Sequence, residues 1–478
     1  MSWQFTRSLW GKPQREFIGG PPKLTAGEHG ARWRARPGVV RLAAVGVLLV
    51  VMTAIGPALH HRFGGIAHWT VIALTAAGAC WAALTSERLD LRSALLTIAL
   101  FALAMRLTLL FSTPYLSDDL YRYIWDGRVQ AAGINPYRYV PAASELERLR
   151  DTAIYPMINR AEYAPTIYPP AAQMVFLAIT RLGESVLVMK LGLVVLELVA
   201  MASTMFILRR LGQPLTRIAA FAWHPLAVWE IAGNGHVDAA MLGLMLPGVV
   251  LFLSHRALAA GAMVTAAALV KPIALLALPV FWRPWNFKLV GVFAATALAL
   301  YLPYLSVGWK VLGFLGGYVE EEELSRGAGF RYIIIAERMF GPLPGAAPWY
   351  LGVCAVLLVG MAAAVGFRRD RSERTTLACL VVLLTGFLVM LTPHYPWYYL
   401  ALVPFLAVFP ASWTLWLLTV GGLQTYQAIP GEIMPDYIDR QVVFHSIVLA
   451  AIARDTWAFG LLRSHHPALT KTTGDLPK

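Results

Sequence analysis

The feature that most constrains this chain is the repetition of apolar runs about 20 residues long. These runs recur from residues 39–59 to residues 442–462, with Arg and Lys gathered at their ends. A run of this length crosses a bilayer as an α-helix, whereas a transmembrane barrel shows short alternating segments. Only 14% of the 478 residues are charged, against about 25% in soluble proteins. We therefore expect an all-α, multi-pass membrane protein with roughly 11–13 transmembrane helices.

The placement of positive charge predicts the topology. The formal net charge is +13, but the basic residues lie at the ends of apolar runs, which indicates orientation in a membrane rather than nucleic-acid binding. We expect residues 1–38 to be a basic, disordered cytoplasmic tail rather than a cleaved signal, and residues 463–478 to be a second cytoplasmic tail. Residues 39–462 then form the transmembrane domain, with long outer loops at 112–170 and 305–347. The three cysteines lie in apolar runs and are expected to be buried thiols.

Several apolar segments depart from the simple span. Residues 171–182 are too few to cross and are expected to be re-entrant or to lie on the surface. Residues 256–282 contain Lys271 followed by Pro272, which predicts a hairpin of two half-helices. Residues 218–231 are expected to be one outward span.

The first outer loop begins with an acidic pair, Asp118 and Asp119, directly after an apolar run. The pKa of a carboxylate at a membrane boundary is raised by partial desolvation and by a charged twin, and is lowered by nearby cations such as Arg122 or Arg128. This environment is suitable for a general base. Ser117-Asp-Asp is also a typical start of an amphipathic helix, in which one carboxylate caps the backbone. The two interpretations are compatible, because one aspartate can cap while the other projects.

Lys271 is the most informative single residue. A cation inside an otherwise uncharged apolar run marks a functional site by default, and an anionic phosphate is a suitable partner. The alternative is a lysine that snorkels to the interface at the tip of a hairpin.

Further polar residues are weaker candidates. Glu230, His236 and Asp238 could bind a divalent cation or a sugar, although an Asn-Gly capping turn also explains the segment. The aromatic residues around His394 fit an interfacial belt, with His394 itself an open candidate. Arg331 in the second outer loop could contact phosphate. The sequence shows no Walker motif, dinucleotide fingerprint or internal repeat, which argues against ATP-driven transport.

Together these residues resemble the GT-C superfamily of integral-membrane glycosyltransferases, most closely the polyprenyl-phosphate-mannose-dependent mannosyltransferases. The resemblance lies in the acidic pair at 118–119, YRYIWDGR at 121–128, GINPY at 133–137, YPP at 168–170, NGHVD at 234–238 and the Lys271-Pro pair. It implies a GT-C-type bundle that uses a sugar on a polyprenyl phosphate at the non-cytoplasmic face of the cell membrane. An acidic residue of the first outer loop would act as base, with inversion at the anomeric carbon; carried over by position this is Asp118 or Asp119, with Asp118 favoured slightly.

The resemblance also implies the remaining site residues. A second functional acidic residue is usual in the family, and Asp238 and Glu162 are the guesses here. The expected donor-phosphate ligands are Lys271, Arg122, Arg128 and Arg331. The expected sugar or acceptor contacts are Tyr121, Trp125, Asp126, Asn135, Tyr168, His236, Asp238 and His394.

The expected partners are a polyprenyl-phosphate sugar, a glycan or glycolipid acceptor and the bilayer, with no nucleic acid. No cofactor is certain, a divalent cation is left open, and the sequence identifies neither the sugar nor the acceptor. The alternatives are a secondary transporter or flippase of lipid-linked sugars, and a polymerase or ligase of lipid-linked glycans.

Overall fold

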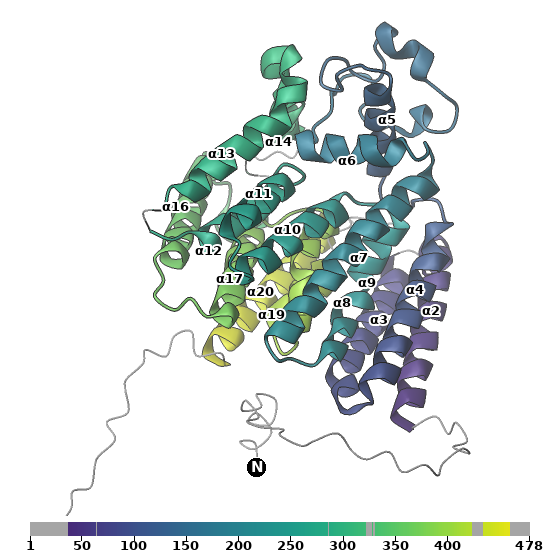
Figure 1. Ribbon diagram of the computed structural model, residues 1–478, viewed down its shortest axis with the longest axis vertical. Helices are drawn as coiled ribbons and strands as arrows, with labels where there is room; N and C mark the ends of the chain where they lie inside the picture. The colour runs from purple at the N-terminus through teal and green to yellow at the C-terminus, as the bar shows by residue number, and fades with distance from the viewer. Residues whose placement is uncertain are drawn as a thin grey trace, which may run out of the picture. The chain divides into compact units, whose positions relative to one another are not determined.

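A computed structural model describes residues 37–63, 65–284, 286–321, 327, 330–422 and 434–458. The predicted tail at 463–478, and the predicted tail at 1–38 except for residues 37–38, lie outside the described residues. Within the described part all regular structure is helical (Figure 1).

Seven helices are long and apolar enough to cross a membrane, or up to eight if one bent pair counts as a span, among the residues described. They are Pro37–Leu59 in α2 (Pro37–Phe63), Thr70–Arg88, which includes most of α3 (Gly65–Thr85), α4 (Leu91–Leu110), α7 (Val186–Arg210), Lys288–Glu321, which begins with α13 (Lys288–Tyr301), α16 (Ala346–Gly366) and α17 (Glu373–Leu391). Large apolar side chains on these helices are exposed, such as Val356 at 72% and Leu96 at 62%. An exposed apolar surface on this scale needs lipid around it, so the chain is a multi-pass membrane protein, as predicted.

Among the described residues, fewer helices span without interruption than the predicted 11–13, because several apolar segments are short or broken. The shorter apolar helices are α6 (Pro170–Thr180), α11 (Ala257–Ala268), the pair η6 (Pro272–Ala277) and α12 (Leu278–Phe281), and the pair η8 (Pro396–Leu402) and α18 (Val403–Val408). The break between α11 and η6 falls at Lys271-Pro272, where the sequence predicts it, and Lys271 itself is extended.

The segment 218–231 differs from the single span that we predict. It consists of η4 (Leu215–Ile218), α8 (Ala219–Ala222), α9 (Pro225–Ala227) and the π-helix η5 (Val228–Gly233), followed at a bend of 120° by α10 (Asp238–Leu253). His224 has extended backbone angles and precedes Pro225, and the residue before a proline is disfavoured in a helix. The His-Pro pair therefore interrupts the run.

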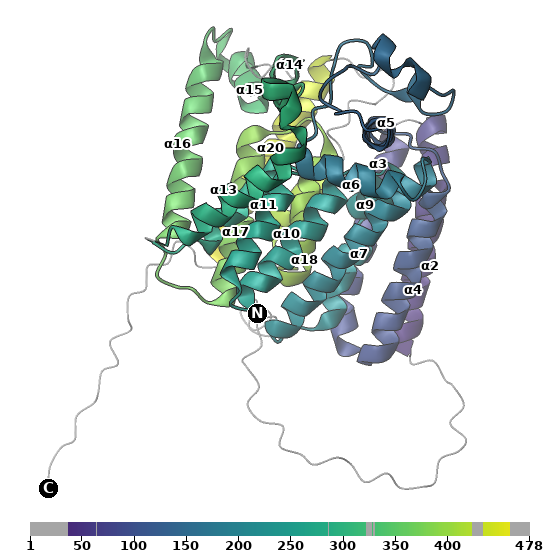
Figure 2. The same cartoon turned by 45° about the horizontal axis from the view of Figure 1, so that its top comes forward.

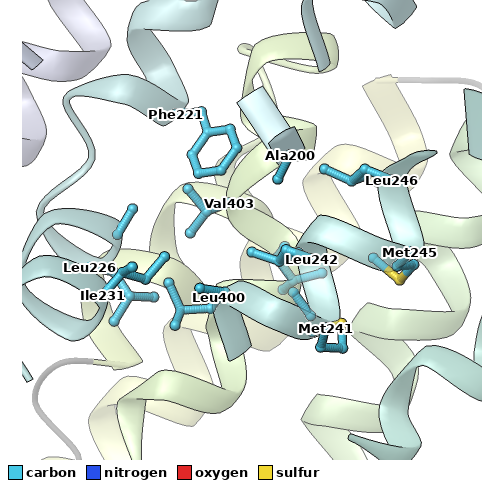
Figure 3. Packing of buried hydrophobic residues seen from close by; sticks show 14 of the residues in the cluster. Ala200, Phe221, Leu226, Ile231, Met241, Leu242, Met245, Leu246, Leu400 and Val403 are labelled. Atoms are coloured by element: carbon cyan, nitrogen blue, oxygen red, sulfur yellow. The ribbon is translucent and has the colours of Figure 1, made fainter. Parts of the chain in front are cut away.

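α10 lies at the centre of the packing, against α7 and α11. Figure 3 shows part of this core, where Phe221, Leu226, Met241, Leu242 and Val403 from segments far apart in sequence meet. The remaining helices are α14 (Leu315–Glu321), α15 (Arg331–Phe340), α19 (Trp413–Gly421) and α20 (Met434–Ala458), with short 3-10 turns between several elements.

The first long loop carries α5 (Asp119–Ala131), which packs against α6. These two helices lie together at one end of the bundle, and the α16–α17 connection lies at the other end (Figures 1 and 2). The same loop contains the 3-10 helix η2 (Ser144–Leu149), in which Leu146 is buried.

Candidate active site

The acidic pair lies at the N-terminus of α5, and its two carboxylates are in different environments. The backbone N–H of Asp119 donates to Ser117 Oγ at 3.3 Å, so the serine supplies a local acceptor at the helix start. The Asp118 side chain makes no capping hydrogen bond and is exposed. Asp118 therefore projects, which is the arrangement that leaves a carboxylate available to a substrate.

Although the side chain is exposed, partial desolvation of its carboxylate raises the pKa of Asp118 above its ordinary value, and the neighbouring charge of Asp119 raises it further. A carboxylate whose pKa lies closer to neutrality is a better proton acceptor in its ionised form. Asp118 thus combines access to solvent with a raised pKa.

Asp119 is held from two sides. Asn159 Nδ2 donates to its Oδ1 at 3.3 Å, and His236 Nδ1 lies 4.0 Å from its Oδ2. Its side chain is 24% exposed. Asp119 is therefore the carboxylate of the pair that the protein fixes in place.

His236 stands between Asp119 and Glu230. Its ring is 1% exposed, its Nε2 lies 3.1 Å from Glu230 Oε2, and it stacks on Trp397 with centroids 4.0 Å apart. Despite the short distance, Nε2 lacks a hydrogen-bond partner of good geometry, so we treat the contact as a close approach of His236 to the carboxylate rather than a formed hydrogen bond.

The π-helix η5 brings Glu230 and His236 together. The backbone N–H of His236 donates to the Glu230 carbonyl at 2.9 Å, and Gly235 between them has a φ of +73°. Asn234 donates to Glu230 Oε2 at 3.2 Å and accepts from the backbone N–H of Leu116 at 3.2 Å. The turn after η5 is thereby joined to the connection that leads into α5. Single π-turns of this kind occur often at functional sites.

Lys271 is paired inside the protein. Its Nζ donates to both oxygens of Asp238, at 2.7 and 2.8 Å, and lies 4.0 Å from the centroid of the Tyr398 ring. The lysine side chain is 13% exposed. The Asp238 partner and the Tyr398 ring thus surround the Lys271 ammonium in the structure.

Tyr123 of α5 connects the acidic pair with the Asp238–Lys271 pair. Burial, and then the charges of Asp119 and more weakly of Asp238, raise the pKa of Tyr123. Tyr168 packs edge-on against Tyr123 with centroids 4.9 Å apart, and the pKa of Tyr168 is also raised by burial and then by Asp119. Asp119 therefore acts on both rings and Asp238 on Tyr123, so these carboxylates share Tyr123 as a common neighbour. We name the region comprising Asp118, Asp119, Tyr123, Tyr168, Glu230, His236, Asp238 and Lys271 the acidic cluster.

Other predicted ligands hold the first loop together instead. Asp126 accepts from Arg122 Nε at 2.8 Å and from Gln173 at 2.9 Å, and it also bonds to Thr166. Arg122 and Asp126 are 5% and 1% exposed, so this network is closed to a ligand in the structure.

The remaining predicted residues of the loop are also engaged or buried. Arg128 forms ion pairs with Asp151 and Glu184, each at 2.7 Å. Asn135 donates to the Tyr304 carbonyl at 2.9 Å. Trp125 and Tyr121 are buried, while Glu162 is exposed.

Arg331 is the first residue of α15, and His394 lies in the connection between α17 and η8. Arg331 is buried, and its backbone N–H donates to Thr392 Oγ1 at 3.0 Å. The ring of His394 is 6.4 Å from that of Tyr395, which stacks on Trp397 and so leads to His236. The rings of Tyr395 and Trp397 therefore lie between His394 and His236 of the acidic cluster.

The predicted trio of Glu230, His236 and Asp238 does not converge on one point, because Asp238 turns to Lys271. No group of three or more His, Cys, Asp or Glu side chains is placed to hold a metal ion in the part of the chain that the structure describes.

Sequence reasoning missed three members or neighbours of the cluster. Asn159, which fixes Asp119, lies in an irregular loop with no motif. Tyr123 lies within the quoted run but is not singled out there. Tyr398 is taken for part of an interfacial belt, and its ring lies over Lys271.

Comparison with known proteins bears on this region directly. Residues 37–286 match the family model described as "Alpha-(1->6)-mannopyranosyltransferase, N-terminal domain", a range that includes the whole acidic cluster. The chain is 27% identical over 222 residues to alpha-(1->6)-mannopyranosyltransferase A of Mycobacterium tuberculosis, covering 44% of this chain and 42% of that protein. It is 26% identical over 185 residues to the protein of the same name from Corynebacterium glutamicum, covering 37% of each.

The matches span about two fifths of the length of these curated relatives. No solved structure matches the chain significantly. The family model, however, covers more than half of the chain, including the first long loop and the broken helices around Lys271. On this match, the chain belongs to the alpha-(1->6)-mannopyranosyltransferase family.

Proposed function

We propose that the protein transfers mannose from a polyprenyl-phosphate donor to an acceptor hydroxyl, with inversion at the anomeric carbon, on the non-cytoplasmic side of the cell membrane. The observation that carries this proposal is the exposed Asp118 carboxylate beside a fixed Asp119, in a family named for mannosyl transfer. The acceptor is a glycan or a glycolipid.

Asp118 is the general base in this proposal. Its carboxylate takes the proton of the acceptor hydroxyl, the oxygen attacks the anomeric carbon, and the bond from that carbon to the phosphate oxygen breaks. The raised pKa of Asp118 supports this role. Asp119 contributes negative charge and is itself oriented by Asn159 and His236.

Lys271 acts on the donor side. The leaving group is a phosphate, which needs cationic stabilisation rather than a strong general acid. Lys271 is the cation of the acidic cluster that an incoming phosphate can share with Asp238, its partner in the structure. The Tyr398 ring holds the ammonium in place while its carboxylate contact changes. Asp238 is then the second functional acidic residue.

A donor screen tests the proposal. The purified chain, reconstituted in liposomes with a short α-mannoside acceptor, is given polyprenyl-phosphate mannose, glucose, galactose or arabinose, or a nucleotide-linked mannose. We expect transfer from polyprenyl-phosphate mannose alone, with a product whose anomeric configuration is opposite to that of the donor. Transfer from the nucleotide sugar, or movement of the lipid-linked sugar across the membrane without transfer, would contradict the proposal.

The face of the membrane is tested separately. In a cysteine-free background, Glu145→Cys in the first long loop and Arg369→Cys in the α16–α17 connection are both at exposed positions. A membrane-impermeant thiol reagent applied to intact cells is expected to label the first and spare the second. The reverse pattern would place the acidic cluster on the cytoplasmic side.

A further inference from the structure

A second polar site lies at the end of the bundle away from α5, where the α16–α17 connection runs (Figure 2). A cavity of about 310 Å³ opens there between the end of α10, the start of α11, the end of α12 and the start of α17. Arg283, Arg368 and Arg371 line it together with Phe252, Leu258 and Phe281. The lining therefore combines a set of cationic side chains with a set of apolar ones, which we call the apolar wall.

The positive charge of this cavity is not balanced by its own carboxylates. Glu373, the acidic residue that lines it, is in an ion pair with Arg210 at 2.6 Å. Asp370, next to the cavity, is bonded to Ser372 and Thr375 of its own turn. No carboxylate among the described residues is within ion-pair distance of Arg283, Arg368 or Arg371.

Arg368 and Arg371 also have a structural role. Arg368 donates to the carbonyls of Val365 and Val280, at 2.8 and 3.1 Å. Arg371 donates to the carbonyls of Gly366 and Trp282, at 2.6 and 2.8 Å. A cation near the C-terminus of a helix is favourable, so these contacts explain why the two arginines are held in place.

Helix capping leaves the positive charge of both guanidiniums, and one hydrogen-bond donor of Arg368, available to a ligand. Arg368 Nε is buried and has no hydrogen-bond partner among the described atoms, and carbonyl dipoles do not neutralise a full charge. Burial, and then the nearby Arg371, lower the pKa of Arg368, although Cys379 and Asp370 act in the opposite sense. Burial and Arg283 lower the pKa of Arg371 in the same way. Two fixed guanidiniums, those of Arg368 and Arg371, share the cavity with the exposed Arg283, and the buried Nε of Arg368 is an unused donor. This arrangement calls for an anion with several acceptor oxygens.

The apolar wall indicates what else the anion carries. Phe252 and Phe281 stack with centroids 4.3 Å apart, and Leu258 beside them is 47% exposed. A free inorganic anion gains nothing from such a wall, whereas the first carbons of a lipid do. Basic pockets between transmembrane helices typically bind anionic lipid head groups.

We propose that this cavity binds the phosphate group of an anionic phospholipid, with the guanidiniums of Arg283, Arg368 and Arg371 on the phosphate and the Phe252–Phe281 face against the lipid chain. The site is separate from the acidic cluster and does not depend on the function proposed for that cluster. Its chemistry is shared with soluble phosphate esters, so the test distinguishes the two sources.

The test measures binding to the full-length protein in neutral detergent. The probes are phosphatidylglycerol in mixed micelles, phosphatidylcholine as the uncharged comparison, and inorganic phosphate. Binding is followed by the thermal unfolding midpoint and by titration calorimetry. The variants are Arg283→Gln, at an exposed position that makes no helix-capping contact, and Arg369→Gln as the matched control, which is exposed in the same connection and does not line the cavity.

We expect saturable binding of phosphatidylglycerol that weakens about fivefold in Arg283→Gln and is unchanged in Arg369→Gln. Binding that inorganic phosphate reproduces at the same affinity would keep the phosphate site but assign it to a soluble phosphate ester. Equal responses of Arg283→Gln and Arg369→Gln to both phosphate probes, or no preference for phosphatidylglycerol over phosphatidylcholine together with no phosphate binding, would overturn the proposal.

Discussion

The Arg106–Glu197 pair and the acidic cluster differ in how completely their charges are paired. Deep in the bundle, Arg106 of α4 and Glu197 of α7 form a two-pronged ion pair at 2.6 and 2.8 Å, with side chains 3% and 0% exposed. Arg106 also donates to the Ala222 carbonyl at 2.8 Å. In the acidic cluster, Asp118 is exposed without a capping bond, and His236 approaches Asp119 only to 4.0 Å.

This difference shows that charge inside an apolar run is not by itself a sign of function. Lys190 is fully buried in α7 and donates to the carbonyls of Leu109 and Ser112, at 3.1 and 2.6 Å. It holds the end of α4, from which the chain continues to Asp118. Arg106, Glu197 and Lys190 therefore support the framework, and the acidic cluster is distinguished by access and by contacts that a ligand can replace.

The largest effect is expected from Asp118→Asn. An asparagine keeps the shape but cannot take the acceptor proton, so kcat should fall by roughly 10²–10⁴-fold. Because the carboxylate is exposed and uncapped, thermal stability should stay close to that of the wild type. Turnover of polyprenyl-phosphate mannose by the reconstituted variant measures kcat, and thermal unfolding in detergent measures the stability.

Asp126→Asn is the matched control on the same helix. Asp126 is buried and accepts from Arg122, Thr166 and Gln173, so this variant should lose stability before it loses turnover per folded molecule. A fully active Asp118→Asn enzyme would remove Asp118 as the base and leave Asp119 to be tested by Asp119→Asn.

Arg106→Met should lower the stability of the protein rather than its turnover per folded molecule, which is the reverse of the effect expected for Asp118→Asn. It leaves Glu197 charged and unpaired in the bundle, which costs about 3–5 kcal/mol. The double variant Arg106→Met with Glu197→Met should recover most of this loss, because no charge is then left buried. Unfolding of the three proteins in detergent measures the stability; specific loss of kcat in a well-folded double variant would mean that this pair also takes part in catalysis.

Lys271→Met should weaken use of the donor by about 10²-fold in kcat/KM, which is typical for removal of one preorganised group that stabilises developing negative charge. Lys271→Arg, which keeps the cation, should restore part of the activity. Donor titration at a fixed acceptor concentration measures the effect. Unchanged donor dependence in Lys271→Met would reduce the Asp238–Lys271 pair to a structural contact like Arg106–Glu197.

The fold was predictable where hydrophobicity alone decides it. The apolar runs that became α2, α4, α7, α16 and α17 are visible in the sequence, as is the break at Lys271-Pro272. Residues 218–231 differ because the His224-Pro225 pair outweighs the apolar character around it. Pro225 is visible in the sequence, but the mean hydropathy of a long window does not reveal the break that one proline causes.

The site was predictable only in part, since its members come from four separated segments. Asp118 and Asp119 are visible as an acidic pair after an apolar run, and Lys271 as a lone cation. Pairing is a tertiary property, however, so the Asp238–Lys271 contact and the engagement of Arg122 and Arg128 with carboxylates of the first loop could not be derived from spacing. The same limit hid the structural role of Arg106 and Lys190.

The smallest effect concerns the pH dependence of the acidic pair. Asp118 acts as a base only when ionised, so kcat/KM should fall as the pH drops through its raised pKa. Burial is the first cause of that raised pKa and the charge of Asp119 the second. Neutralising Asp119 in Asp119→Asn removes the second cause. The ionised form of Asp118 is then favoured, so the acid limb of the residual activity should move to lower pH.

A pH profile of kcat/KM for the wild type and Asp119→Asn measures the shift, with Asn159→Ala as a control that loosens Asp119 but keeps its charge. A limb that moves to higher pH, or that stays in place, would show that the charge of Asp119 does not raise the pKa of Asp118. Loss of the acid limb together with the activity in Asp119→Asn would show that Asp119 rather than Asp118 carries the proton.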